Sequence, residues 1–170
     1  MVSPFAPMVA LRQRTPAQTA FGHVLRAFGL IHRVMRPYFQ QYGLSQAQWA
    51  ILRTLHRAQE EEGLKNGLRM GELGQRLLVQ PPSVTTLVRR LVKAGLVAQS
   101  AAPNDRRGFE LRLTPKGESL VSRVLLAHQD QIRSVMGGLG DEELPAFCQY
   151  LERVNTHLAA LAAKTPDTLD

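Results

Sequence analysis

The stretch from Gln80 to Gly117 constrains the fold more than any other part of the chain. Apolar residues recur there at i, i+3, i+4 and i+7 and form one stripe: Val84, Leu87, Val88 and Leu91. Hydroxyl and basic side chains occupy the other side. Pro81 suits the first turn of a helix, and Gly95 suits its C-terminal end. The pattern predicts a short amphipathic helix with one basic, solvent-facing side.

A β-hairpin is predicted directly after this helix. Val97–Ser100 and Phe109–Thr114 have strand character, and the segment P-N-D-R-R-G between them is rich in turn-forming residues. Arg106 and Arg107 would then lie at the tip, where they face solvent or a polyanion because burying them would be costly. A helix followed by an arginine-tipped hairpin is typical of a winged helix-turn-helix, whose helix enters the major groove and whose wing reaches the minor groove.

These residues resemble those of the MarR-type transcriptional regulators. The pattern D-x-R-x-x-x-L-x-L-T-x-x-G spans Asp105–Gly117, and the positions before it agree as well: Leu87, Val88, Leu91, Gly95, Leu96 and Val97. The resemblance covers about residues 15–163. The sequence departs from the family pattern in a longer linker within 57–69 and in the proline pair Pro81–Pro82.

The expected fold is mainly α-helical with a small β-hairpin wing. In chain order we expect a flexible arm (1–14), a dimerisation helix (15–43), a DNA-binding lobe (45–114), further dimerisation helices (115–163) and a tail (164–170).

The terminal helices carry more apolar surface than one small lobe can cover, so a homodimer would bury it. The resemblance implies the same: the first and last two helices intertwine into a two-fold dimer. Its recognition helices would lie about 34–36 Å apart on a pseudo-palindromic site.

Local signals predict the other element boundaries. The first helix should bend near Pro37. Ser45 and Gln48 form a capping box that starts the second helix, and Thr114–Pro115 starts the next long one. Leu68–Leu78 is expected to form a brief strand and the first helix of the helix-turn-helix.

The candidate DNA contacts come from the polar side of the helix and from the hairpin: Gln80, Pro82, Ser83, Thr85, Thr86, Arg89, Arg90, Arg106 and Arg107. Arginine or glutamine can make paired hydrogen bonds to guanine or adenine edges. The resemblance implies that one wing arginine, Arg107 by position, enters the minor groove while Asp105 supports it. The alternative for both segments is an ordinary solvated surface.

Charge and composition favour a polyanionic partner over an acidic protein surface. The net charge is +7, and the chain has one cysteine, which permits no internal disulfide and indicates a reducing, cytoplasmic setting. No apolar run reaches the ~18 residues that span a bilayer. The motifs G-x-x-x-x-G-K-[ST], H-E-x-x-H and G-x-S-x-G are missing, so we expect neither enzymatic activity nor a cofactor.

A small anionic effector is a further expectation. The resemblance implies a pocket for aromatic or phenolic carboxylates between the first, second and fifth helices. Trp49 and Arg53 share one helical face and could stack on a ring and pair with its carboxylate, and His32 and Arg36 form a similar pair. The residues before Glu60 include no acid, which makes this region positive. The alternative is a core tryptophan beside a surface arginine.

Other sensing chemistries have weaker support. His32 and His128 could converge as in zinc-sensing relatives, but no spaced Cys/His/Glu cluster accompanies them, so no metal site is expected. Cys148 lies on the apolar stripe of the last helix, and we expect a buried core thiol. The sequence therefore indicates a dimeric repressor that a small anion releases from double-stranded DNA. The rival interpretation is an architectural protein that binds DNA without sequence preference or ligand.

Overall fold

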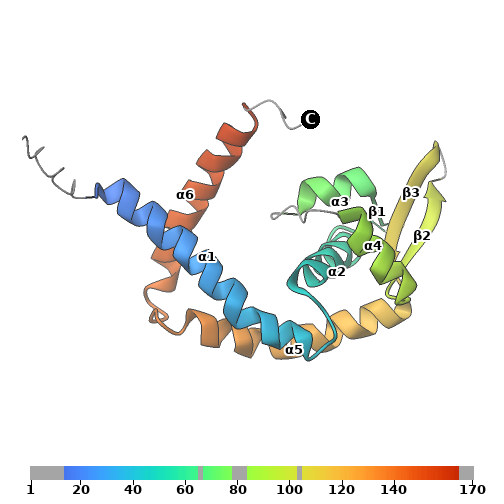
Figure 1. The fold of residues 1–170 in the computed structure, drawn as a ribbon, viewed down its shortest axis with the longest axis horizontal. Coiled ribbons are helices and arrows are strands. Elements are labelled where there is room, and N and C mark those ends of the chain that lie inside the picture. Colours follow the sequence, from blue (N-terminus) through green and yellow to red (C-terminus); the bar gives the residue numbers. More distant parts are fainter. Residues whose placement is uncertain (1–13, 65–66, 78–83, 103–104, 165–170) are drawn as a thin grey trace, which may run out of the picture. The chain divides into compact units, whose positions relative to one another are not determined.

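The computed structural model describes residues 14–64, 67–77, 84–102 and 105–164 (Figure 1). Its elements, in chain order, are α1 (Pro16–Gln40), α2 (Gln46–Glu60), β1 (Leu68–Arg69), α3 (Met70–Arg76), α4 (Val84–Lys93), β2 (Val97–Ala102), β3 (Asp105–Leu113), α5 (Pro115–Met136) and α6 (Leu144–Ala162). The chain divides into two compact units, Met1–Leu126 and Ala127–Asp170. The mainly helical fold with a small antiparallel sheet is confirmed.

The first two helices begin at capping boxes. Ser45 Oγ accepts a hydrogen bond from Gln48 N at 3.2 Å, and Gln48 Oε1 accepts one from Ser45 N at 2.9 Å. Thr15 and Gln18 make the same reciprocal pair at the start of α1. Each box pairs backbone N–H groups that have no partner inside the helix, which is why the sequence pattern identified the start of α2 correctly.

The sheet has the strand order β1-β3-β2, with both pairs antiparallel. The predicted hairpin is present, but the predicted loop boundaries are wrong because β3 already begins at Asp105. The register moves from Ala101 opposite Phe109 to Ala102 opposite Asp105. Residues 106–108 are therefore accommodated as a bulge within β3, and the two arginines belong to a strand rather than to a loop.

The core of the first unit lies between α2, the two helices of the helix-turn-helix (α3 and α4) and the sheet. Ile51, Leu52 and Leu55 of α2 are completely buried. Leu73 and Leu77 point inward, as do the buried sheet and α4 residues: Leu68, Val88, Leu91, Val97, Leu111 and Leu113. Burying one such side chain stabilises the fold by roughly 1.5–3 kcal/mol, so this core fixes the position of α4 and the wing.

The terminal helices keep most of their apolar surface exposed in the single chain. Phe21, Leu25 and Phe28 of α1 are each more than half exposed, and α6, which is described throughout, has no buried residue. The prediction of a buried Cys148 is wrong for this chain, since the residue is exposed together with the rest of α6. Among the described residues, no helix combines the length and apolar character needed to cross a bilayer.

Candidate nucleic-acid interface

Helix α4 presents a basic, hydroxyl-bearing side to solvent. Thr85, Thr86, Arg89 and Arg90 are exposed, while Val88 and Leu91 on the opposite side are buried. The division follows the helical period that the sequence predicted, because residues three and four apart share a face. A single short helix with this polarity is suited to a major groove, with its cations toward the phosphates or bases.

Several predicted DNA contacts cannot be placed. Gln80, Pro82 and Ser83 lie outside the described residues. The backbone of Asp105–Arg107 is described as part of β3, but the positions of these side chains are not. Their assignment as wing contacts and wing support therefore stays a prediction from the sequence.

Two acidic residues that directly follow α2, Glu61 and Glu62, form ion pairs with arginines of α2 and α3. Arg76 Nη1 donates to both carboxylate oxygens of Glu62, at 2.8 and 2.7 Å. Glu61 accepts a 3.0 Å hydrogen bond from Arg57 and pairs with Arg53 at 3.1 Å. The bond from Arg57, with a contribution from Arg53, holds the pKa of the Glu61 carboxyl below its usual value. The acidic linker thus neutralises nearby arginines and ties α3 to α2.

The candidate effector residues have different surroundings. Trp49 is buried, and its ring stacks on Phe39 with centroids 5.6 Å apart, as expected for a core tryptophan. Arg53 is partly exposed, whereas His32 and Arg36 are exposed on α1. The Nη1 atom of Arg53 is buried and has no hydrogen-bond partner among the described residues. No group of three or more potential metal-ligating side chains converges in the described ranges.

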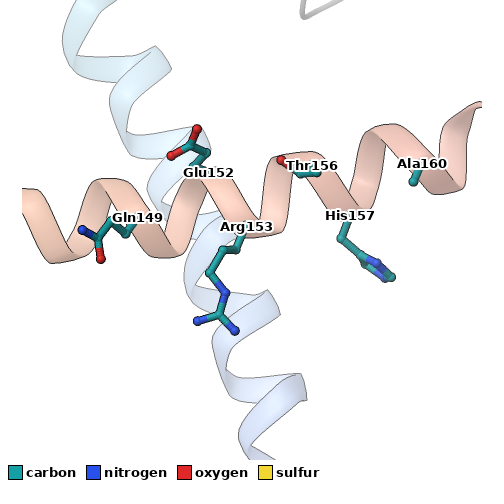
Figure 2. A pocket seen from close by; sticks show the side chains of 6 residues that line it. All are labelled: Gln149, Glu152, Arg153, Thr156, His157 and Ala160. Atoms are coloured by element: carbon teal, nitrogen blue, oxygen red, sulfur yellow. The ribbon is translucent and has the colours of Figure 1, made fainter.

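A surface hollow on α6 does not add a further binding site. Its lining residues all come from that one helix (Figure 2): Gln149, Glu152, Arg153, Thr156, His157 and Ala160. The labelled side chains project from different sides of the helix and do not converge on a common point. An enclosed ligand site is concave and draws polar groups together, so this hollow is an open helix surface.

Sequence reasoning missed several polar contacts that position the interface. Gln59, Thr114 and Lys116 each bond backbone groups 19 to 54 residues away. Thr114 was predicted as the end of a strand, as a helix cap and as part of a motif, but its contact with Gly95 was not predicted. No local pattern reveals such contacts, because each depends on how distant segments pack.

Comparison with known proteins agrees with this geometry. The MarR family model matches residues 42–108. The transcriptional regulator PecS of Dickeya dadantii is 28% identical over 137 residues, which cover 81% of this chain and 80% of PecS. The transcriptional repressor YetL of Bacillus subtilis is 30% identical over 121 residues, which cover 71% of this chain and 70% of YetL.

Solved structures show the same fold. Sco3205, a MarR family transcriptional regulator from Streptomyces coelicolor in complex with DNA, superposes with a TM-score of 0.73 at 22% identity, over 86% of this chain and 94% of Sco3205. Bordetella bronchiseptica BpsR, whose DNA binding is regulated by 6-hydroxynicotinic acid, gives a TM-score of 0.71 at 21% identity, over 84% and 97% of the two chains.

The fold and the basic helix define a winged helix-turn-helix protein of the DNA-binding class. The chain belongs to the MarR family of transcriptional regulators. This family is non-enzymatic, and its members act by binding DNA.

Proposed function

We propose that this regulator is a homodimeric repressor that binds a pseudo-palindromic duplex and leaves it when a small anion binds. The observation that carries the proposal is the exposed basic face of α4, supported by a buried core and followed by the wing. A repressor with this arrangement blocks transcription by occupying promoter DNA.

The terminal helices would form the dimer. On α6 the exposed apolar residues follow helical spacing: Phe147, Tyr150, Leu151, Val154, Leu158 and Leu161. The N-terminal two-thirds of α1 carries a second exposed apolar face. Exposed apolar surface of this extent marks an interaction site, and a second copy of the chain covers both faces with closed two-fold symmetry. Residues 15–43 and 115–163 then form the dimerisation region around the lobe 45–114.

DNA recognition would use both parts of the lobe. Thr85, Thr86, Arg89 and Arg90 approach bases and phosphates in the major groove, together with Gln80, Pro82 and Ser83, which precede the helix in sequence. Arg107 enters the minor groove, Arg106 contacts a phosphate, and Asp105 supports the wing. The resulting neutralisation of phosphates makes the affinity fall steeply as salt rises.

The effector would bind at the partly buried face of α2 that carries Gln46, Arg53 and His56. The side-chain atoms Gln46 Oε1, Arg53 Nη1 and His56 Nδ1 are buried without hydrogen-bond partners among the described residues. Gln46 and Arg53 are seven residues apart and share a helical face, and His56 lies one turn beyond Arg53. Buried polar groups are normally satisfied. A carboxylate would satisfy the Nη1 atom of Arg53, whose Nη2 atom already pairs with Glu61.

The effector's chemistry follows from the neighbours of Arg53. Trp49 precedes Arg53 by one turn and packs against Phe39, and we propose that the indole forms part of the wall of such a site. From α1, Arg36 would add a positive charge and His32 a hydrogen-bonding group. An aromatic carboxylate suits these groups, and it would release DNA only through a difference in affinity between DNA-competent and incompetent shapes.

Two measurements test these statements. In a competition assay, the regulator should prefer DNA from beside its own gene over random duplex by ~10³ or more; equal affinities would instead indicate an architectural protein. In calorimetry, salicylate should bind the wild-type protein and Arg57→Ala but not Arg53→Ala. Arg57 is the matched control because it shares the partner Glu61. The absence of binding heat with the wild type would contradict an effector of this class.

A further inference from the structure

The C-terminal end of α4 is closed by a specific backbone motif. Gly95 has φ +70°, its N–H donates to Val92 O at 2.9 Å, and the N–H of Leu96 donates to Leu91 O at 3.0 Å. This pair of bonds is a Schellman motif, which glycine favours because the left-handed conformation strains other residues. The motif satisfies the carbonyl groups of Leu91 and Val92. It leaves the carbonyl groups of Ala94 and Gly95, which follow the end of α4, to other donors.

Two residues at the start of α5, the preceding Thr114 and Lys116 of its first turn, supply the donors for these two carbonyls. Lys116 Nζ donates to Ala94 O at 2.9 Å, and Thr114 Oγ1 donates to Gly95 O at 2.7 Å. The same hydroxyl accepts a 3.1 Å bond from Gly117 N, so Thr114 also caps α5. An ammonium group at the C-terminal end of a helix also interacts favourably with the helix dipole.

The backbones of the two segments are in close contact at the same place. Thr114 N donates to Leu96 O at 3.1 Å. A Cβ atom added to Gly117 would lie 2.1 Å from that carbonyl oxygen, well inside contact distance, and 3.4 Å from the side chain of Leu113. Only a residue without a side chain allows α5 to start this close to the end of α4, and Figure 1 shows the two helix ends side by side.

We propose that Thr114, Lys116 and Gly117 form a clamp that fixes the orientation of the recognition helix α4 relative to α5. These are positioning residues: they act on DNA recognition through the backbone of Ala94, Gly95 and Leu96. Two side-chain bonds, one backbone bond and one steric contact meet at this junction. Because α4 cannot tilt without breaking them, a displacement of the start of α5 carries the recognition helix with it.

Weakening the clamp should reduce the protein's preference for one DNA sequence without reducing its general affinity for DNA. The inference rests on the proposed function only in requiring a duplex that the wild-type protein prefers. Such a duplex is obtained by selection from a random-sequence pool with the wild-type protein, and a shuffled duplex of equal length and composition serves as reference. Fluorescence anisotropy then measures both affinities over a series of salt concentrations.

The main variant combines Thr114→Val with Lys116→Met, which removes both side-chain donors while keeping side-chain size. We expect it to bind the selected duplex at least fivefold more weakly, to bind the shuffled duplex within twofold of wild type and to keep the salt slope. A second double variant, Thr114→Ser with Lys116→Arg, should bind selectively like the wild type, because it keeps a hydroxyl donor and a cationic donor at these positions. Circular dichroism and amide exchange show whether α4 remains folded, with faster exchange confined to residues 91–97 and to Gly117, whose N–H loses the Thr114 hydroxyl.

The control is Arg123→Met, which removes one exposed cation from the same helix. Gly117→Ala should also weaken binding of the selected duplex, because the added methyl group would push the start of α5 away from Leu96 O. Binding of the selected duplex within twofold of wild type by the double variant would overturn the clamp. So would an equal loss on both duplexes with a reduced salt slope, since Lys116 would then be a phosphate contact. A wild-type protein that enriches no duplex would contradict the proposed function, and the clamp's role in DNA recognition with it.

Discussion

Gln59 of α2 joins the recognition lobe's core to its wing by accepting a 2.7 Å hydrogen bond from the backbone N–H of Leu113. Leu113 is the last residue of β3, the central strand, whose opposite end carries the wing. Within the described part of the chain, strand β1 pairs with β3 at Leu111 and Glu110. The glutamine side chain therefore extends the anchoring of β3 to the point where the strand passes into α5.

Replacing Gln59 tests this anchor. Gln59→Met keeps the side chain's length but leaves the partly buried N–H of Leu113 without its acceptor, which should lower the free energy of unfolding by about 1–3 kcal/mol. Urea denaturation at fixed protein concentration measures the change. Gln75→Met, at an exposed position of α3, is the control and should stay within about 0.5 kcal/mol of wild type. Equal stabilities of the two variants would show that the bond contributes nothing.

Trp49 should contribute strongly to stability because it fills the core beside Phe39. Trp49→Ala removes a buried indole, and the expected loss is about 3–5 kcal/mol in the free energy of unfolding. Phe109, half exposed on β3, is the matched aromatic control, and Phe109→Ala should cost much less. Thermal and urea unfolding provide the comparison. A Trp49→Ala protein as stable as wild type would show that the ring is not a core residue.

Tyr38 should make the protein sensitive to alkaline pH. Its hydroxyl donates to Val124 O at 2.9 Å, and burial, aided by Tyr42, raises its pKa from 10.0 to about 12. The folded state thus retains a proton that the unfolded state loses above pH 10. Its contribution to stability is complete below pH 10 and disappears as pH rises toward 12. Unfolding measured from pH 9 to 12 should show this decline in the wild type and a weaker decline in Tyr38→Phe.

The arginines of the interface should determine how DNA affinity depends on salt. Arg107→Ala should weaken binding to the preferred duplex at least tenfold and flatten the plot of log affinity against log salt, because one fewer phosphate-associated counterion is released. Arg89→Ala should do the same from α4. Arg133→Ala removes an equal charge from an ion pair with Asp130 on α5 and serves as the control. Unchanged affinity for the Arg107 variant across the salt series would exclude that residue from the interface.

Local signals in the sequence predicted most helix boundaries and the polarity of α4. Ser45 with Gln48, and the stripe containing Val88 and Leu91, are short-range patterns whose outcome depends on residues a few positions apart. The long helices near both ends of the chain followed from the same periodicity. These features could be predicted because the chain's own local geometry produces them.

Features set by packing between distant segments could not be predicted. The bulge at 106–108 depends on the register between two strands, so turn-forming composition alone assigned those residues to a loop. Cys148 was expected to be buried because its neighbours are apolar, but burial requires a partner surface that the single chain does not place over α6. The clamp joins residues that are far apart in sequence, and only its individual members, Thr114 and Gly117, were visible as parts of a motif.

The most direct test of the account has two parts. Analytical ultracentrifugation on the selected duplex measures how many chains bind, and a base-pair insertion tests the spacing between the half-sites. We predict a dimer in solution and two chains on one duplex, with half-site centres about one helical turn apart. Inserting five base pairs between the half-sites rotates them to opposite sides of the duplex and should abolish selective binding. A monomer in solution, or unchanged binding after the insertion, would contradict the paired recognition helices on which the proposed function depends.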